Sequence, residues 1–463
     1  MKKALCILFA VVMIVSMFGC QQTMQDQSTT TGLSTQPTTP PEQVKNYPLV
    51  SGTFMQPWAF AGYSLEQLVT HMQYLKAVGI ELLIVQSTMN TTDQIHQVCF
   101  RGSFDDAVKA EDFEDTQQDF LGNVLEAAKV CGMEVFVGLA NDGAWWSKVF
   151  SDQQWLDDHL ELSMLGAKQI YDNYKKDYAD TLTGWYFWPE YWNMDLSVTA
   201  AATDFLSRYR DGLYAIDPNM PMLLSPFLSS GGTAPEQTGK FWTDVLSGST
   251  LRSGDIFCCQ DSVGAGYMQL DQIDAYFAAM KAAADTKEGL LFWANNEDFT
   301  PNFKSADMGR FVQQLEITHK YTDTHISFAF CHYRNPDVGK QKSYDAYKLY
   351  YETGALIQRY ADCPDVQVTS EGQGRYVHFT VTADNAGGDL CQIIITKDGQ
   401  VVFQQHFDPD ATASMATVSV NYTDENENVG PIQRFYTIYT VDIYGNISEE
   451  NVHTLMVYTK ESE

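Results

Sequence analysis

Basic residues are scarce in this sequence. Its 463 residues include 59 acidic but only 29 basic side chains, which gives a formal net charge of −30 at pH 7. Nucleic-acid binding requires basic patches that release counterions from phosphates, and the longest basic runs are the pairs at 2–3 and 175–176. Nucleic acid is therefore not an expected partner. The acidic residues are spread along the chain, which is typical of a solvated surface.

The sequence also lacks metal-site and dinucleotide-site motifs. It has no Cys-x-x-Cys pair and no His/Cys spacing typical of zinc, and no G-x-G-x-x-G motif follows the first predicted strand. Of the nine cysteines, seven remain beyond Cys6 and Cys20, an odd number that cannot pair completely. We interpret Cys258, Cys259 and Cys331, which lie in apolar runs, as buried small hydrophobic side chains. We expect neither a metal nor a cofactor.

Long apolar runs are absent except at the N-terminus. Two lysines precede an apolar run over residues 4–18, which is too short for an ordinary spanning helix, and MFGC follows at 17–20. This segment resembles a bacterial lipoprotein signal in which Cys20 carries the lipid, palmitate included. We therefore predict a signal peptide over 1–20 and an extracytoplasmic protein, lipid-anchored to the cell membrane or cell surface. An ordinary cleaved signal and a retained anchor are the alternatives.

The next segment, residues 21–46, consists mainly of Gln, Ser, Thr and Pro. Such a composition buries almost nothing, so we expect a disordered tether that holds the folded part away from the membrane.

Between residues 47 and 361, short apolar runs alternate with amphipathic segments, the pattern of a parallel sheet covered by helices. The candidate strands are 49–56, 80–86, 133–141, 182–190, 220–227, 255–261, 290–297 and 326–333. Eight strands with a helix after most of them predict an α/β fold, the (β/α)8 or TIM barrel, which typically uses about 250 residues. An open, doubly wound sheet is the alternative.

Helix signals occur between these strands. Ser64 is a predicted N-cap, with Gln67 three residues later and Gly79 at the helix end. Further helical segments are expected over 153–178, 198–215, 271–284, 305–321 and 344–360.

Residues 362–463 alternate apolar and polar side chains at period two, with turns such as KDG at 397–399 and YGN at 444–446. About seven short strands in ~100 residues predict an all-β sandwich. The segment YTVDIYGNIS resembles the hairpin that ends many fibronectin type III domains. We expect this domain to act as a spacer. Carbohydrate binding through tyrosines such as Tyr376, Tyr436 and Tyr444 is the alternative.

The ends of the predicted barrel strands carry mainly acids, amides and indoles. In TIM barrels the chemistry lies at the carboxyl ends of the strands. Amides and carboxylates can bond vicinal hydroxyls, and indole faces can stack on sugar rings, so a carbohydrate substrate is predicted. The candidate binding residues are Gln56, Trp58, Gln86, Asn141, Asp142, Trp145, Trp188, Trp192, Gln260, Asn295, His332 and Tyr333. For His332 and the tryptophans, packing is the alternative.

Two glutamates follow strands four and seven of the predicted barrel. Glycoside hydrolysis needs one protonated carboxyl group and one ionised carboxylate. The aromatic surroundings of Glu190, in GWYFWPEYW, should raise its pKa, and the polar neighbours of Glu297 should keep that carboxylate ionised. Period-two alternation aligns Glu190 with Tyr186 and Glu297 with Asn295. We predict catalytic roles for both glutamates, with Asp261 after strand six as a rival.

This placement resembles the clan of retaining glycosidases whose acid/base follows barrel strand four and whose nucleophile follows strand seven. The resemblance implies that Glu190 is the acid/base and Glu297 the nucleophile, although Pro189 stands where that clan usually has Asn. The stretches GTFMQPW, LKAVGIELLIVQ, GWYFWPE and CCQDSVG resemble recurring segments of an uncharacterised bacterial family of glycosidase-like barrels, described as a domain of unknown function.

Three hypotheses remain open. A cell-surface glycoside hydrolase, expected to be a monomer, is favoured. A non-catalytic glycan-binding lipoprotein for capture or adhesion would need the same amides and rings without converging carboxylates. A barrel deacetylase or amidase would need a metal cluster or an activated Ser or Cys at the strand ends, where the sequence has neither.

Overall fold

The computed structural model describes residues 45–91, 96–102, 113–115, 119–426 and 431–457. The predicted signal peptide, its Cys20 and nearly all of the tether lie outside these ranges. Residues 47–463 form one compact unit. Among the helices in the described ranges, none is long and apolar enough to cross a membrane.

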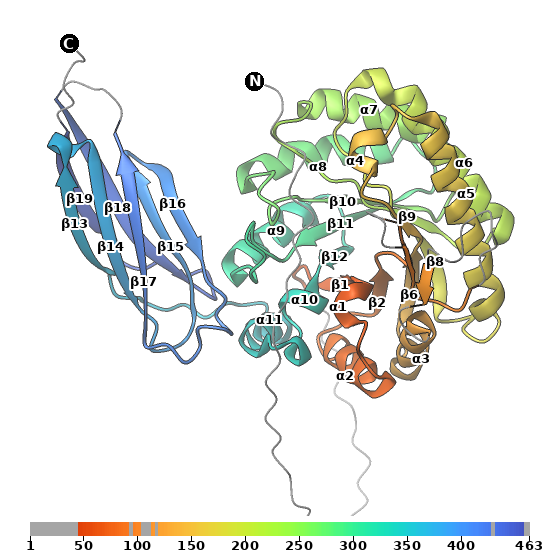
Figure 1. Ribbon diagram of the computed structural model, residues 1–463, viewed down its shortest axis with the longest axis horizontal. Coiled ribbons are helices and arrows are strands. Elements are labelled where there is room, and N and C mark those ends of the chain that lie inside the picture. Colours follow the sequence, from red (N-terminus) through yellow and green to blue (C-terminus); the bar gives the residue numbers. More distant parts are fainter. Residues whose placement is uncertain (1–44, 92–95, 103–112, 116–118, 427–430, 458–463) are drawn as a thin grey trace, which may run out of the picture. The chain divides into compact units, whose positions relative to one another are not determined.

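The first part of this unit is a closed barrel of eight parallel strands, with helices around it (Figure 1). The strand order is β1-β12-β11-β10-β9-β8-β6-β2. The strands are β1 (Val50–Met55), β2 (Leu82–Val85), β6 (Glu134–Gly138), β8 (Leu182–Phe187), β9 (Met222–Leu224), β10 (Ile256–Gln260), β11 (Leu291–Glu297) and β12 (His325–Phe328). All eight predicted strands are present, so the TIM-barrel prediction is confirmed and the open sheet is excluded.

Several strand ends differ from the prediction, and β9 ends at Leu224, three residues before its predicted end. Strand β8 ends at Phe187, three residues before Glu190, and the predicted end of strand eight forms the short helix α10 (Phe330–Tyr333). The predicted third strand divides into β6 and β7 (Ala140–Asn141). β7 joins a small sheet with β3 (Met89–Asn90), β4 (His96–Val98) and β5 (Phe113–Asp115).

Most of the predicted helices begin and end close to the predicted positions, but the last, expected to run to residue 360, ends at Thr353. Ser64 and Gln67 form a reciprocal capping box on α2, and Gly79 has a positive φ of 79° just beyond that helix. The sequence analysis did not identify α3 or α7. The helices are α1 (Pro57–Phe60), α2 (Leu65–Lys76), α3 (Phe120–Cys131), α4 (Trp145–Lys148), α5 (Gln153–Ile170), α6 (Thr199–Ile216), α7 (Pro235–Gly248), α8 (Leu270–Ala284), α9 (Met308–His319), α10 and α11 (Gln341–Thr353).

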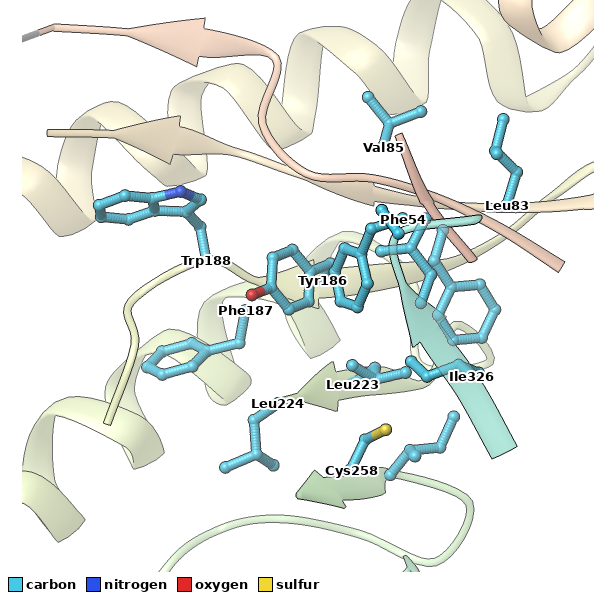
Figure 2. Packing of buried hydrophobic residues seen from close by; sticks show 14 of the residues in the cluster. Phe54, Leu83, Val85, Tyr186, Phe187, Trp188, Leu223, Leu224, Cys258 and Ile326 are labelled. Carbon is cyan, nitrogen blue, oxygen red and sulfur yellow. The ribbon is translucent and has the colours of Figure 1, made fainter. Parts of the chain in front are cut away.

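Alternation along β8 places its side chains as predicted. Tyr186 lies edge-on to Phe54 of β1, with ring centroids 5.0 Å apart, inside the barrel (Figure 2). Phe187 packs in the opposite direction against Tyr209 of α6, and Trp185 is fully buried. The strand therefore directs one set of rings into the barrel and the other toward the helices. The barrel cysteines Cys258, Cys259 and Cys331 are fully buried, as expected.

Two antiparallel sheets form the predicted sandwich, which has its own apolar core. One sheet has the order β13-β14-β17 and the other β16-β15-β18-β19. The turn between β15 and β16 has positive φ at Asp398 and Gly399, the geometry of a tight hairpin. The strands are β13 (Asp365–Glu371), β14 (Tyr376–Asp384), β15 (Leu390–Lys397), β16 (Gln400–His406), β17 (Thr417–Glu425), β18 (Ile432–Asp442) and β19 (Asn451–Val457).

One sandwich tyrosine is a core residue. Tyr436 is fully buried, and its hydroxyl donates to Asp424 over 2.7 Å. The suggestion that Tyr436 could contact a surface ligand is therefore wrong.

Candidate active site at the carboxyl ends of the strands

Glu190 lies in the segment that follows β8, beside aromatic side chains. Its backbone carbonyl accepts a hydrogen bond from Trp145 Nε1 over 3.0 Å. Its side-chain Oε1 accepts a longer bond, 3.3 Å, from Gln260 Nε2. Burial raises the pKa of Glu190 to about 7, and the bond from Gln260 opposes the rise. The expected direction of the shift is thus present.

Side-chain amides on β10 and β11 both donate hydrogen bonds to Ser225, which follows β9. Gln260 Nε2 also donates to the Ser225 carbonyl over 2.7 Å, and Asn295 Nδ2 donates to the Ser225 hydroxyl over 3.1 Å. Gln260 and Asn295 are direct neighbours in the sheet. The Oδ1 atom of Asn295 is buried and accepts no hydrogen bond. A ligand hydroxyl could reach that oxygen only if the side chains that cover it moved, so the predicted ligand contact of Asn295 stays a prediction.

Glu297 ends β11 and is almost fully buried. Its Oε2 accepts a hydrogen bond from the backbone N–H of Ala265 over 2.6 Å. Gly264 permits this approach, because a Cβ atom there would lie 2.8 Å from Glu297 Cβ and 2.7 Å from the Phe299 carbonyl oxygen. The β10 loop therefore fixes one oxygen of the Glu297 carboxyl group.

The electrostatic surroundings of Glu297 differ from the expectation. Burial and then the negative charge of Asp261 raise its pKa to about 8, and the charge of Glu190 adds to the rise. The Ala265 N–H and the positive charge of Arg310 act in the opposite direction. The expectation that polar neighbours alone keep this carboxylate ionised is wrong. The interaction between the two glutamates also indicates that their side chains lie within electrostatic reach of each other.

Asp261 lies between β10 and the helix α9, with its carboxyl group fully buried. Its Oδ1 accepts from the backbone N–H groups of Val263 and Glu297, both over 3.2 Å. Its Oδ2 accepts from Asn296 over 3.0 Å and from Gln314 of α9 over 2.6 Å. Four donors thus occupy this carboxylate, and these contacts favour a positioning role for Asp261 over direct attack on a substrate.

A second set of candidate binding residues lies around His332. The Gln56 backbone N–H donates to His332 Nε2 over 3.2 Å, and the Gln56 side chain donates to Gln86 over 2.9 Å. Burial lowers the pKa of His332 to about 3, so the ring is neutral and accepts this bond. Trp58, 72% exposed, stacks over His332 with centroids 6.2 Å apart. Next to it, Tyr333 stacks on Phe299, and burial raises the pKa of its hydroxyl.

Two of the predicted binding tryptophans are packing residues. Trp145 is fully buried and stacks on Tyr191, and Trp188 is 7% exposed beside His159. The prediction that the Trp145 ring stacks on a ligand is wrong, because no face of it is open. Trp188 is also largely enclosed, so its contribution to a ligand site is small at most.

Asn141 and Asp142 lie at the end of the third barrel strand. The Asn141 carbonyl accepts from the Thr91 hydroxyl over 3.1 Å. Asp142 accepts from the Ala144 N–H over 2.8 Å and from Trp155 Nε1 over 3.2 Å. Asp142 therefore organises the turn into α4, while Asn141 is half-buried and remains a candidate contact.

Four rings follow successive strand ends: Trp146, Trp192, Phe227 and Tyr267. The Trp146–Trp192 and Trp192–Phe227 centroids are each 5.9 Å apart and the Trp146–Phe227 centroids are 5.8 Å apart, so these three rings form a triangle. Tyr267 extends the group from Phe227, over 5.9 Å. We call these four residues the aromatic row. Sequence analysis selected only Trp192 as a candidate contact, since Phe227 and Tyr267 lie in loops whose path the sequence pattern does not reveal.

Two cavities occur away from these glutamates. One of about 480 Å³ is lined by Arg101, Gly102, Gln169, Asp172 and Asn173, and the other, of about 200 Å³, lies near Tyr63 and Asp337. Neither contains a residue of the candidate site. Within the described ranges, no group of three or more His, Cys, Asp or Glu side chains is arranged to hold a metal ion.

Solved structures share the barrel. One, described as a "putative alpha-L-fucosidase" from Bacteroides thetaiotaomicron, aligns with a TM-score of 0.57 and 20% identity over 69% of this chain and 99% of that chain. An endo-beta-1,4-mannanase from Thermotoga petrophila aligns with a TM-score of 0.32 and 8% identity over 90% of this chain and 99% of its own. These similarities concern the fold alone. No curated protein matches this sequence.

A family model covers the whole barrel. Residues 50–340 match the family described as "Domain of unknown function (DUF4434)". This range includes all eight barrel strands, both glutamates and the four segments on which the family resemblance rests. The chain therefore belongs to the DUF4434 family.

Proposed function

We propose that this protein is a glycoside hydrolase that acts on an oligo- or polysaccharide, with Glu190 as the general acid/base and Glu297 as the nucleophile. One observation carries the proposal: Glu190, which is half-buried just after barrel strand four, and Glu297, which is buried at the end of strand seven, both have raised pKa values, and the charge of Glu190 contributes to the rise at Glu297. A TIM barrel alone supports many reactions, so the argument depends on this pair and its neighbours.

The shared proton is assigned to Glu190. Two nearby carboxyl groups do not both ionise readily, so the pair holds about one proton near neutral pH. Burial and the charge of Asp261 raise the pKa of Glu297 to about 8, above the value of about 7 at Glu190, so the two pKa values alone would place the proton on Glu297. We assign it to Glu190 on hydrogen-bond geometry, because Glu297 receives a 2.6 Å bond from a backbone N–H and the positive charge of Arg310 favours its anion. Glu190 receives only the 3.3 Å bond from Gln260. The anion is thus better stabilised at Glu297.

The proposed reaction retains the anomeric configuration. Glu297 attacks the anomeric carbon while Glu190 donates its proton to the departing glycosidic oxygen, and a covalent glycosyl-enzyme forms. Glu190, now ionised, takes a proton from water, which displaces Glu297 from the sugar. Asn295 Oδ1, which accepts no hydrogen bond within the protein, would bind a sugar hydroxyl only if the side chains that cover it moved.

The test is a screen of the full chain on aryl glycosides and on plant, host and bacterial polysaccharides, beside Glu190→Gln and Glu297→Gln. We expect each variant to lose at least about a thousandfold in kcat on natural glycans, since each removes a reacting group. On dinitrophenyl glycosides, whose leaving group needs no proton, Glu190→Gln should retain much more activity than Glu297→Gln. The opposite order would exchange the two roles.

Two other results would change the proposal. Proton NMR of the first product gives its anomeric configuration. An inverted product would mean that Glu297 acts as a general base that activates water and not as the nucleophile. Glycan binding without turnover would favour the capture lipoprotein instead.

We also propose that the protein is held at the outer surface of the cell membrane by a lipid on Cys20, which the signal-like segment 1–20 supports. Expressed in a bacterial host, the full chain should partition into the detergent phase of Triton X-114. A Cys20→Ser chain should move to the aqueous phase, and equal partitioning of both would refute the anchor.

A further inference from the structure

The aromatic row is a ring surface that adjoins the candidate site and that the proposed reaction does not use. Its two ends are open, because Trp146 is 36% exposed and Tyr267 is 39% exposed. Trp192 and Phe227 between them are half-buried and stack on each other with an interplanar angle of 28°. Rings exposed in a continuous series usually mark a binding surface.

Both ends of the row are connected to the two glutamates. Trp192 follows Glu190 by two residues, and the backbone N–H of Phe227 donates to the Tyr191 carbonyl over 3.0 Å. At the other end, Tyr267 follows Ala265, whose N–H holds Glu297. The segments that carry Trp192 and Tyr267 therefore also carry Glu190 and the residue that fixes Glu297.

The loops that carry the row are held by backbone bonds. The Ser230 N–H donates to the Tyr267 carbonyl over 3.0 Å, and the N–H groups of Tyr267 and Met268 both donate to the Ser262 carbonyl over 3.1 Å. Asn193 joins the Trp192 segment to the Phe227 loop, since its Nδ2 donates to the Ser229 carbonyl over 2.8 Å. The rings are thus presented on fixed backbone, which limits the entropy lost when a ligand binds.

We propose that the aromatic row binds an uncharged glycan chain of several sugar units, and so places the substrate across the ends of barrel strands three to six. This inference rests on the proposed function for its ligand class. Ring faces suit the C–H faces of sugars. The triangle of Trp146, Trp192 and Phe227 together with Tyr267, a further 5.9 Å from Phe227, gives a surface larger than one sugar ring. The four rings carry no charge, while Glu190, Glu297 and the net charge of −30 would repel an anionic chain.

Binding to soluble polysaccharides tests this inference apart from turnover. The full chain carrying Glu297→Gln is titrated with glucomannan, xylan, mixed-linkage glucan and polygalacturonate by affinity electrophoresis and calorimetry. Trp146→Ala and Tyr267→Ala are introduced into that background because both side chains are exposed and their loss should not prevent folding. Tyr360→Ala, at a side chain that is 73% exposed, is the matched control.

We expect at least one neutral polysaccharide to bind, with Kd about tenfold higher in Trp146→Ala and in Tyr267→Ala and unchanged in Tyr360→Ala. Unchanged affinity in both row variants, or no binding of any probe, would overturn the inference. Equal binding of polygalacturonate would overturn its restriction to uncharged chains. If binding depends on the row but no glycan is hydrolysed, the hydrolase proposal fails and the binding surface remains. If hydrolysis depends on both glutamates but not on the row, only this inference fails.

Discussion

The backbone N–H of Ala265 lies 2.6 Å from Oε2 of Glu297, 32 residues later in the chain. The contact joins the loop after β10 to the end of β11. It holds one carboxyl oxygen of Glu297 still and stabilises its negative charge. The position of Glu297 therefore depends on the loop beside it as well as on its own strand.

A side chain at position 264 should displace Glu297. A Cβ in Gly264→Ala would lie 2.8 Å from Glu297 Cβ and 3.0 Å from its Oε2. Because a misplacement of about 1 Å can reduce a rate by about 10²-fold, we expect a fall of that order in kcat. The variant should also lose stability, since the same Cβ would lie 2.7 Å from the Phe299 carbonyl oxygen. Gly62→Ala is the matched control, since no atom lies within 4 Å of its Cβ position. Equal kcat in both variants would show that the approach of the loop does not matter.

Asp261 should contribute to stability more than to the chemical step. In Asp261→Asn, an NH2 group would face two of the four N–H donors that the carboxylate now accepts. We expect the free energy of unfolding to fall by about 2–4 kcal/mol. Urea unfolding followed by tryptophan fluorescence measures this in the barrel, which contains all nine tryptophans. Asp323→Asn, at a side chain that is 97% exposed, is the control.

The outcome also separates the two roles considered for Asp261. A nucleophile replaced by Asn would abolish activity while stability stayed unchanged or rose. A positioning residue would lower stability and leave measurable activity in the folded protein, with the pH profile of kcat/KM preserved.

The eight strands were predictable from sequence because parallel barrel strands form short apolar runs between amphipathic helices. The helix α2 was equally clear, since Ser64 and Gln67 carry a recognisable capping signal. Alternation also aligned Tyr186 with the barrel interior. These features depend on neighbours in the sequence, and local patterns record them well.

The sequence contains no comparable local pattern from which contacts between loops could be predicted. Trp145 and Trp146 are adjacent indoles after the same strand, yet the first is fully buried and the second is 36% exposed. No local pattern distinguishes them. The bond from Ala265 to Glu297 likewise joins residues 32 positions apart, and the charge of Asp261, which raises the pKa of Glu297, comes from another strand. The positions of the two glutamates after strand four and at the end of strand seven followed from the strand pattern, while the surroundings that set their ionisation did not.

Removal of the Gln260 side chain should shift the pH dependence of catalysis. Its N–H bond to Glu190 lowers the pKa of that carboxyl group, so the Glu190 pKa should rise in Gln260→Met. Since Glu190 must be protonated to act as an acid, kcat/KM of the wild-type chain should fall above about pH 7. In the variant, this fall should move to higher pH. A profile of kcat/KM from pH 5 to 9 measures the shift, and movement to lower pH would contradict the assignment of Glu190 as the acid.

Glu190→Gln should change how the stability of the barrel depends on pH. The folded-state pKa of Glu190, about 7, lies above the ordinary value of 4.5. Between these values the folded chain binds more protons than the unfolded chain, so wild-type stability should fall as pH rises through this window. Glu190→Gln has no carboxyl group at this position, so its stability should not show this fall. Between pH 5 and pH 8, the free energy of unfolding of the wild type should therefore fall by about 2 kcal/mol more than that of Glu190→Gln.

Urea titrations of both chains at the two pH values, followed by tryptophan fluorescence, measure this difference. Glu66→Gln, at an exposed residue of α2, should run parallel to the wild type because water already solvates that carboxylate in the folded state. If the free energies of unfolding of the wild type and Glu190→Gln differed by the same amount at both pH values, Glu190 would ionise as easily in the folded chain as in the unfolded one. The aromatic segment would then not dehydrate Glu190, and the reason for assigning it the proton would be lost.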